Sequence, residues 1–190
     1  MKYILGLDVS TSCTGWCVLR LDDDTSIHLE EIGYIPLQKC KSLSDKAIAV
    51  RDAFNEICKS YHIHYTFIEE NLQVFRPGFS SAKTLLTLAR FNGVASFLSW
   101  EAFKIDPQFL NVNAARKSVG LKIIRKSHGG PPTKVQVYNW VDDQLEPGYQ
   151  WPMKTLKGGP KKGEVRLDTA SYDMADAYVV ARAGCLTLLK

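Results

Sequence analysis

The sequence lacks the features that would place the chain in a membrane, in an oxidising compartment or around a structural zinc ion. No apolar run approaches the roughly 20 residues that a membrane-spanning helix needs, and the apolar run after Met1 and Lys2 is too short for the core of a secretory signal. The five cysteines are odd in number and include no CxxC pair, which favours reduced thiols over disulfides or zinc ligands. We therefore expect an intracellular, cytoplasmic protein with no membrane contact.

A strong excess of one charge is also missing. The formal net charge is +4 and the pI is near 8.7, a balance that is compatible with binding to nucleic acid without requiring it. The length of 190 residues allows one domain with a substantial core, and 45% hydrophobic with 23% charged residues is typical of a soluble globular protein. We expect a single domain spanning residues 1–190.

What the sequence does contain is a set of acidic residues at the ends of apolar segments. A short apolar run from the N-terminus stops at Asp8, and a Ser/Thr-rich turn then leads into a second apolar run, which predicts a β-hairpin. Residues 65–68 form another apolar run that ends at Glu69. Asp173 and Asp176 begin an apolar helix, and their spacing of three places both on one helical face.

Carboxylates that converge in an apolar site repel one another unless a cation is present. Three or four of them therefore predict a site for a divalent metal ion. Because carboxylates are hard oxygen ligands, Mg²⁺ or Mn²⁺ is favoured over zinc.

The remaining pattern predicts strands and helices that would build a sheet with helical cover. Ser42 and Asp45 indicate the start of a helix, and Ser80 or Ser81 the start of a long helix that ends near Phe103. The other predicted elements are a third strand at 27–34, a last strand at 109–112, a short helix over 114–119 capped by Asn113, and a helix capped by Thr133.

Three motifs in this order resemble those of a known family. Gly6-Leu7-Asp8 with its Ser/Thr-rich hairpin, Ile68-Glu69 and the stretch from Asp173 to Ala177 are similar, in order and approximate spacing, to the acidic motifs of the RuvC-like Holliday junction resolvases. These enzymes belong to the RNase H-like nuclease superfamily. The resemblance spans nearly the whole chain and implies an α/β, RNase H-like fold with a five-stranded mixed sheet flanked by helices on both faces.

The resemblance also implies an activity, which is resolution of Holliday junctions or other branched DNA by paired nicks that leave 5′-phosphate and 3′-hydroxyl ends. Asp8, Glu69, Asp173 and Asp176 would hold two Mg²⁺ ions about 4 Å apart, with Mn²⁺ as a substitute, and no nucleotide cofactor would be needed. Cutting two symmetry-related strands requires two sites, so a homodimer is expected. A nucleoid-associated or viral-DNA-associated protein fits this activity.

The loop after Glu69 contains Phe75, Arg76 and Phe79. An aromatic ring can replace the base stacking that is lost at a branch point, and an arginine can bind phosphate. In the family this loop approaches the junction centre, so we predict that Phe75, ahead of Phe79, stacks on bases and that Arg76 meets the DNA backbone.

Basic residues form two further groups of predicted DNA contacts. The resemblance places Lys117, Arg116 and Lys134 near the scissile phosphate, where Lys134 would neutralise developing charge. The Gly-rich stretch 154–166 is the most basic segment and is predicted to be a loop that becomes ordered on a DNA backbone. Its candidate contacts are Lys157, Lys161 and Lys162.

Departures from the family pattern leave alternatives open. The loop that contains Pro77 is long, and the inserts around Gly129 and Gly158 are unusual, so junction selectivity could be relaxed, as in a branch-specific enzyme of a phage, virus or plasmid. A YqgF-type nuclease acting on RNA would share the acidic set, and a junction-binding module without activity is a further alternative. The first motif also resembles the phosphate loop of actin-like sugar kinases, which need two such domains. Glu70 remains an alternative to Glu69.

Overall fold

The computed structural model describes residues 1–70 and 82–190. Its centre is a five-stranded mixed sheet in the order β3-β2-β1-β4-β5. The first three strands form an antiparallel meander, and β4 and β5 continue the sheet in parallel with β1. The strands are β1 (Lys2–Asp8), β2 (Cys13–Leu21), β3 (Ile27–Pro36), β4 (Ile63–Glu69) and β5 (Gln108–Leu110). The expected five-stranded mixed sheet is confirmed.

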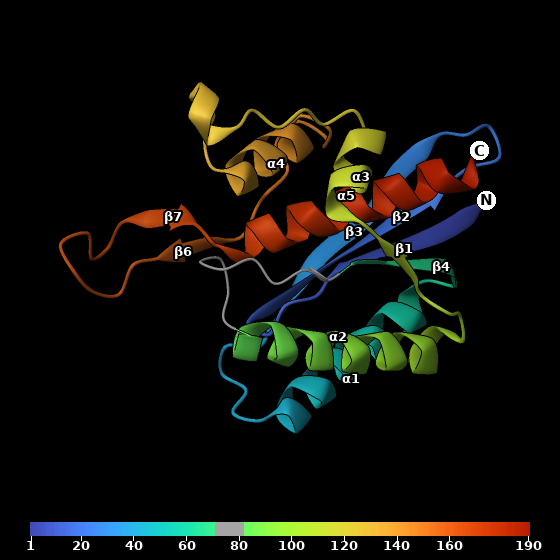
Figure 1. Cartoon of the computed structure of the whole chain (residues 1–190), viewed down its shortest axis with the longest axis horizontal. Coiled ribbons are helices and arrows are strands. Elements are labelled where there is room, and N and C mark those ends of the chain that lie inside the picture. The colour runs from blue at the N-terminus through green and yellow to red at the C-terminus, as the bar shows by residue number, and fades with distance from the viewer. Residues whose placement is uncertain (71–81) are drawn as a thin grey trace.

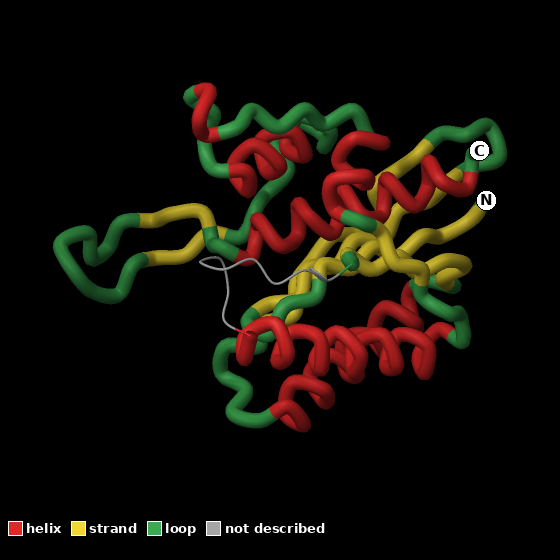
Figure 2. Tube along the Cα trace, viewed as in Figure 1, coloured by secondary structure: helices red, strands yellow, loops and turns green. Residues whose placement is uncertain are grey.

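Helices cover both faces of this sheet, as Figures 1 and 2 show. Two helices pack on one face and three lie on the other, and each group encloses its own apolar core. On the first face are α1 (Leu43–Ser60) and α2 (Ala82–Phe103), and on the second are α3 (Val112–Ser118), α4 (Thr133–Asp142) and α5 (Ala170–Leu188). No helix in residues 1–70 and 82–190 is both long and apolar enough to cross a lipid bilayer.

The alternation of side chains along β1 decides which residues meet which helices. Leu5 and Leu7 are fully buried in the core under α1 and α2, whereas Ile4 is buried in the core under α5. Because successive residues of a strand point to opposite faces, Asp8 lies on the same face as Ile4 and Gly6, the face that α5 covers. Each fully buried leucine contributes about 1.5–3 kcal/mol to folding and so holds this register.

Glycines allow α5 to approach the sheet at backbone distance. A Cβ atom on Gly6 would collide with the backbone of Ala177 and Ala181, and one on Gly15 would collide with the backbone of Asp173. The central strands therefore carry no side chain where the helix crosses them. This close approach brings the first turns of α5 over the ends of β1 and β2.

The structure corrects two predicted helix caps. The Ser42–Asp45 capping box is confirmed, but Asn111, not Asn113, caps α3 by accepting from the backbone N–H groups of Asn113 and Ala114. The predicted strand at 109–112 is β5, which ends at Leu110 to leave Asn111 free for this role. Pro132, rather than Thr133, is the N-cap of α4, with no capping side chain.

The basic stretch before α5, predicted as a loop, contains a β-hairpin that projects from the body of the molecule (Figure 1). Its strands are β6 (Met153–Thr155) and β7 (Val165–Leu167). Pairing continues beyond the strands, because Leu156 N–H donates to Glu164 O at 2.9 Å and Gly163 N–H donates to Leu156 O at 2.8 Å. Gly159 and Gly163 adopt φ of 76° and 90°, which closes a turn that other residues enter only with strain. The prediction of a loop without strands was therefore wrong.

Candidate active site

The first two acidic residues lie at the ends of neighbouring parallel strands. β1 and β4 pair with Leu7 beside Ile68, and Asp8 and Glu69 are the next residues of the two strands. Phe67 is buried in the core under α5, so Glu69, two residues later, faces α5 as Asp8 does. The sheet therefore directs both carboxylates towards the same helix.

The other two acidic residues are on that helix. Asp173 and Asp176 lie in the first two turns of α5, three residues apart. Gly15 is the cross-strand partner of Asp8, and the backbone of Asp173 rests directly on Gly15. The four carboxylates predicted from separate parts of the sequence are thus brought to one end of the sheet.

Their electrostatics show that they interact. Loss of hydration, followed by the charges of Glu69, Asp176 and Asp173, raises the pKa of Asp8 well above its ordinary value. Burial and then the Asp176 charge raise the pKa of Glu69 to about 7. Burial also raises the pKa of Asp173 to about 6, and burial raises the pKa of Asp176. Each carboxyl thus resists ionisation, which is the behaviour of buried carboxyl groups with too little positive charge nearby.

Arg116 is a cation that the protein itself supplies to this cluster. Its Nη2 atom donates to Asp176 Oδ1 at 2.9 Å, and the two side chains are 17% and 18% exposed. The guanidinium also opposes the rise in pKa of Asp8 and Glu69. Its Nε atom is buried with no hydrogen-bond partner within the described residues. Arg116 was predicted as a DNA contact, which stays a prediction; its position beside Asp176 was not foreseen.

Cys13 is a second residue whose position the sequence did not reveal. It is buried, and its thiol forms a hydrogen bond with Asp173 that lowers the pKa of that carboxyl. Burial and the nearby Asp173 charge raise the pKa of the thiol. All five cysteines are free, as expected, so Cys13 acts here as a neutral donor rather than as a redox group.

The predicted basic contacts occupy different positions. Lys134, in the first turn of α4, has its Nζ atom 4.7 Å from the centroid of the Tyr172 ring and is close enough to Asp173 to lower the pKa of that carboxyl. Lys117 is exposed on α3. Lys157, Lys161 and Lys162 are exposed on the turn of the β6–β7 hairpin. Phe75, Arg76 and Phe79 lie outside the described residues.

Glu69 and Glu70 differ in their surroundings. Glu69 is the last residue of β4 on the face under α5, whereas Glu70 follows the strand and its backbone N–H donates to Leu110 O at 2.9 Å. Alternation sends the Glu70 side chain to the other side of the sheet. The arrangement favours Glu69 as the member of the cluster.

The donor set fits a hard divalent cation by its chemistry. Four carboxylates share one end of the sheet, burial raises their pKa values, repulsion among the carboxylates adds to the rise for Asp8, Glu69 and Asp173, and Arg116 partly offsets the charge of Asp8, Glu69 and Asp176. In residues 1–70 and 82–190, however, no three acidic, histidine or cysteine side chains are already grouped closely enough to bind a metal ion. The carboxylates would have to turn towards a common point to do so, and the metal site stays a prediction.

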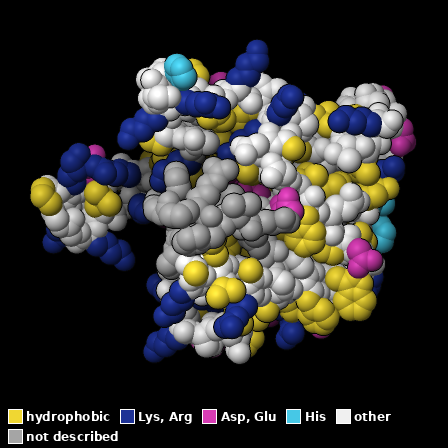
Figure 3. Space-filling view, viewed as in Figure 1, with side chains coloured by type: hydrophobic (Ala, Val, Ile, Leu, Met, Phe, Trp, Pro, Cys, Tyr) yellow, Lys and Arg dark blue, Asp and Glu magenta, His cyan; other side chains and the backbone are white. Residues whose placement is uncertain are grey.

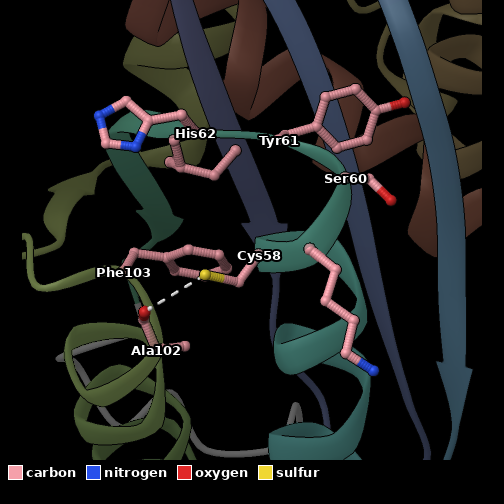
Figure 4. A pocket seen from close by; sticks show the side chains of 8 residues that line it. Cys58, Ser60, Tyr61, His62, Ala102 and Phe103 are labelled. Carbon is pink, nitrogen blue, oxygen red and sulfur yellow. Dashed lines mark hydrogen bonds between the residues drawn. The ribbon is translucent and has the colours of Figure 1, made fainter.

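A cavity at the opposite end of the sheet is a different kind of site. It has a volume of about 420 Å³ and lies between the ends of α1 and α2, where the Cys58 thiol donates to the Ala102 carbonyl at 3.6 Å (Figure 4). It adjoins His62 at the start of β4, about 20 Å along the strand from Glu69. The neighbouring His64 is already satisfied, because its Nδ1 accepts from the Tyr3 backbone N–H. The cavity is therefore separate from the carboxylate cluster.

Comparison with known proteins identifies the fold. No family model and no curated protein sequence matches the chain. Among solved structures, Thermus thermophilus RuvC in complex with a Holliday junction substrate is 11% identical, with a TM-score of 0.65 over 98% of this chain and 95% of that chain. The yeast mitochondrial Holliday junction resolvase Ydc2 is 15% identical, with a TM-score of 0.60 over 97% of this chain and 78% of that chain. The chain has the fold of the RuvC-like resolvases, which confirms at the level of fold the resemblance seen in its acidic motifs.

Proposed function

We propose that this protein is a structure-selective endodeoxyribonuclease that resolves Holliday junctions or related branched DNA. The observation that carries the proposal is the placement of Asp8 and Glu69 at the ends of adjacent parallel strands, under the helix that bears Asp173 and Asp176. The shared fold supports the substrate class, because both similar structures are described as Holliday junction resolvases or their complexes.

The proposed cofactor is Mg²⁺, two ions per site, with Mn²⁺ as a substitute, held by Asp8, Glu69, Asp173 and Asp176. When bound, such ions supply an activated water and charge neutralisation for hydrolysis of a phosphodiester, leaving 5′-phosphate and 3′-hydroxyl ends. Burial first, and then repulsion from neighbouring carboxylates, raise the pKa values of Asp8 and Glu69; this supports the assignment, since a divalent cation would stabilise the charged forms.

The chain's own residues have separate roles in this proposal. Lys134 lies beside Asp173 at the start of α4 and would neutralise charge on the phosphate that is cut. Arg116 would keep Asp176 in place through their ion pair. Lys117, one residue further along α3, is exposed and free to meet a neighbouring phosphate. Phe75 and Phe79 would stack on bases of the DNA, and Arg76 would bind its phosphate backbone.

Two further properties belong to the proposal. Residues 1–190 would act as one domain with one active site. Paired cuts on the two symmetry-related strands of a junction would then need two copies of the chain, related by a twofold axis.

The test is the choice of substrate. Purified protein would be incubated in Mg²⁺ with a labelled four-way DNA junction, a linear duplex of the same sequence and an RNA–DNA hybrid. Nicks confined to the junction would support the proposal. Cleavage of the hybrid or of RNA would replace it with the RNA-nuclease alternative, and junction binding without cleavage in Mg²⁺ or Mn²⁺ would replace it with a binding module.

A further inference from the structure

The β6–β7 hairpin carries the whole net positive charge of the chain. Residues 153–167 contain five of the 24 lysines and arginines and one of the 20 aspartates and glutamates. The rest of the sequence therefore has 19 of each and is formally neutral. Figure 3 shows basic side chains gathered over this projecting element. A polyanion approaching the protein would be attracted to the hairpin before the body.

The lysines are concentrated at the tip, where few acidic groups compensate them. Lys161 is 3.9 Å from Glu164, which also pairs with Arg166 at 2.9 Å. Lys157 and Lys162 have no ion-pair partner among the residues that the structure describes. Such exposed cations bind phosphate well, because each contact releases counterions from DNA.

The two faces of the hairpin differ in character. Met153 and Val165 lie on one face and are 57% and 59% exposed, while Lys154 and Arg166 are cross-strand partners on the other. A two-stranded ribbon is narrow enough to enter the major groove of a duplex, about 12 Å wide. A ribbon with one apolar face and a basic tip can place the apolar face against bases and sugars while the lysines meet phosphates.

The base of the hairpin is tied to the helix that carries the acidic site. Asp168 N–H donates to Pro152 O at 2.8 Å, and Ser171 Oγ donates to the same carbonyl at 3.4 Å. The Asp168 side chain accepts from Ala170 N–H at 3.0 Å, in the first turn of α5. Asp173 follows one turn later, so the hairpin holds a fixed position relative to the carboxylate cluster.

We propose that the β6–β7 hairpin is a second DNA-binding element that grips one duplex arm of the branched substrate away from the site of cutting. This proposal rests on the proposed nuclease function and names how its substrate is held. The hairpin extends up to about 20 Å from its base, a length equal to about six base pairs of duplex. It contacts DNA that lies beyond the reach of the acidic cluster.

The experiment combines a hairpin variant with arms of two lengths. Binding of wild type and of the triple variant Lys157→Gln/Lys161→Gln/Lys162→Gln would be measured in EDTA, on junctions with 20-base-pair arms and on junctions with arms of about six base pairs closed by loops. On long arms we expect affinity to fall at least about tenfold and the slope of log K against log salt to become shallower by about 3. On short arms we expect less than about a twofold loss, since an arm of about six base pairs ends at about the distance of the hairpin tip and leaves little duplex for its lysines to contact.

A matched control keeps the change in net charge but moves it to the other end of the sheet. Lys2, Lys59 and Lys190 are exposed there, and their triple replacement by glutamine is expected to leave binding within about twofold. An equal loss on both arm lengths, or an equal loss in the control, would overturn the hairpin contact.

A second variant separates groove contact from charge attraction. Met153→Gln/Val165→Thr is expected to weaken binding to long arms with no change in the salt slope, and an unchanged affinity would overturn the seating of this face in the groove. Failure of wild type to bind or cut junctions would instead remove the proposed function, so the two failures are distinguishable.

Discussion

Gly15 of β2 leaves no room for a side chain against the backbone of Asp173 in α5. The same glycine is the cross-strand partner of Asp8. This contact therefore fixes how far the first carboxylate of the sheet lies from the first carboxylate of the helix.

Replacing Gly15 by alanine should push α5 away from the sheet. Because the clash is with backbone rather than with a flexible side chain, we expect a loss of about 1–3 kcal/mol in the free energy of unfolding. The rate of junction cleavage should also fall, and by more than the loss of folded protein explains, because Asp173 moves away from Asp8 together with α5. Urea denaturation and junction cleavage would measure the two effects.

Gly93 in α2 provides the matched control. It is exposed, and a Cβ atom there would have no atom of residues 1–70 or 82–190 within 4 Å. Gly93→Ala should stabilise the protein by about 0.5–1 kcal/mol. A Gly15→Ala protein as stable as Gly93→Ala would refute the close approach of α5.

The acidic cluster predicts an unusual dependence of stability on pH. The pKa of Glu69 is raised from 4.5 to about 7 and that of Asp173 from 3.8 to about 6. Between pH 4.5 and 7 the folded state therefore binds protons that the unfolded state does not, so the free energy of unfolding falls as pH rises. We expect a loss of about 1–3 kcal/mol between pH 5 and pH 7.5 in EDTA, measured by urea denaturation.

Glu69→Gln should flatten that profile, because glutamine does not titrate. Mg²⁺ should restore stability at pH 7.5 more than at pH 5. A profile that rises with pH over this range in EDTA would contradict the cluster. Below pH 4 a separate loss is expected, since hydrogen bonds lower the pKa values of Asp24 and Asp45.

Arg116 and Lys117 are adjacent cations with different surroundings, and their replacement should separate stability from DNA contact. Arg116→Gln removes the ion-pair partner of Asp176 and weakens the charge compensation of Asp8 and Glu69, so we expect a loss of about 1–3 kcal/mol in the free energy of unfolding at pH 7.5. Lys117→Gln should change stability by less than about 0.5 kcal/mol. Thermal unfolding of both variants would show the difference. Equal losses in the two variants would mean that the ion pair between Arg116 and Asp176 contributes nothing to stability.

Glu69 and Glu70 can be distinguished by the same substitution. Glu69→Gln should lower the rate of junction cleavage more than about 100-fold, as expected for a direct metal ligand, and Glu70→Gln should leave it within about threefold. Single-turnover cleavage in Mg²⁺ would measure both rates. The reverse order would exchange their roles.

Much of the fold and of the candidate site could be predicted because the relevant signals are local. Asp8, Glu69, Asp173 and Asp176 each stand where an apolar segment ends or begins, and the Ser42 capping box is complete within four residues. Their order along the chain matched a known set of motifs, which supplied the five-stranded sheet.

The features that the sequence did not reveal depend on contacts between distant segments. Arg116 meets Asp176 across 60 residues, and Gly15 meets Asp173 only after α5 has packed. The β6–β7 hairpin was missed because its strands are three residues each and its turn is rich in glycine and lysine, a composition typical of a flexible loop. Asn111 and Asn113 are equally suitable as helix caps by residue type. Asn111 is the cap because β5 ends at Leu110, the residue before it.

The most direct test of the account compares wild type with Asp8→Asn on one labelled four-way junction in Mg²⁺. Asparagine has nearly the same shape as aspartate but lacks the charge that the cluster needs for a metal ion. We predict that wild type makes paired, symmetric nicks whose ends can be religated, and that Asp8→Asn binds the junction with similar affinity but does not cut it. Cleavage by Asp8→Asn at the wild-type rate would contradict the assignment of the four carboxylates as the catalytic centre.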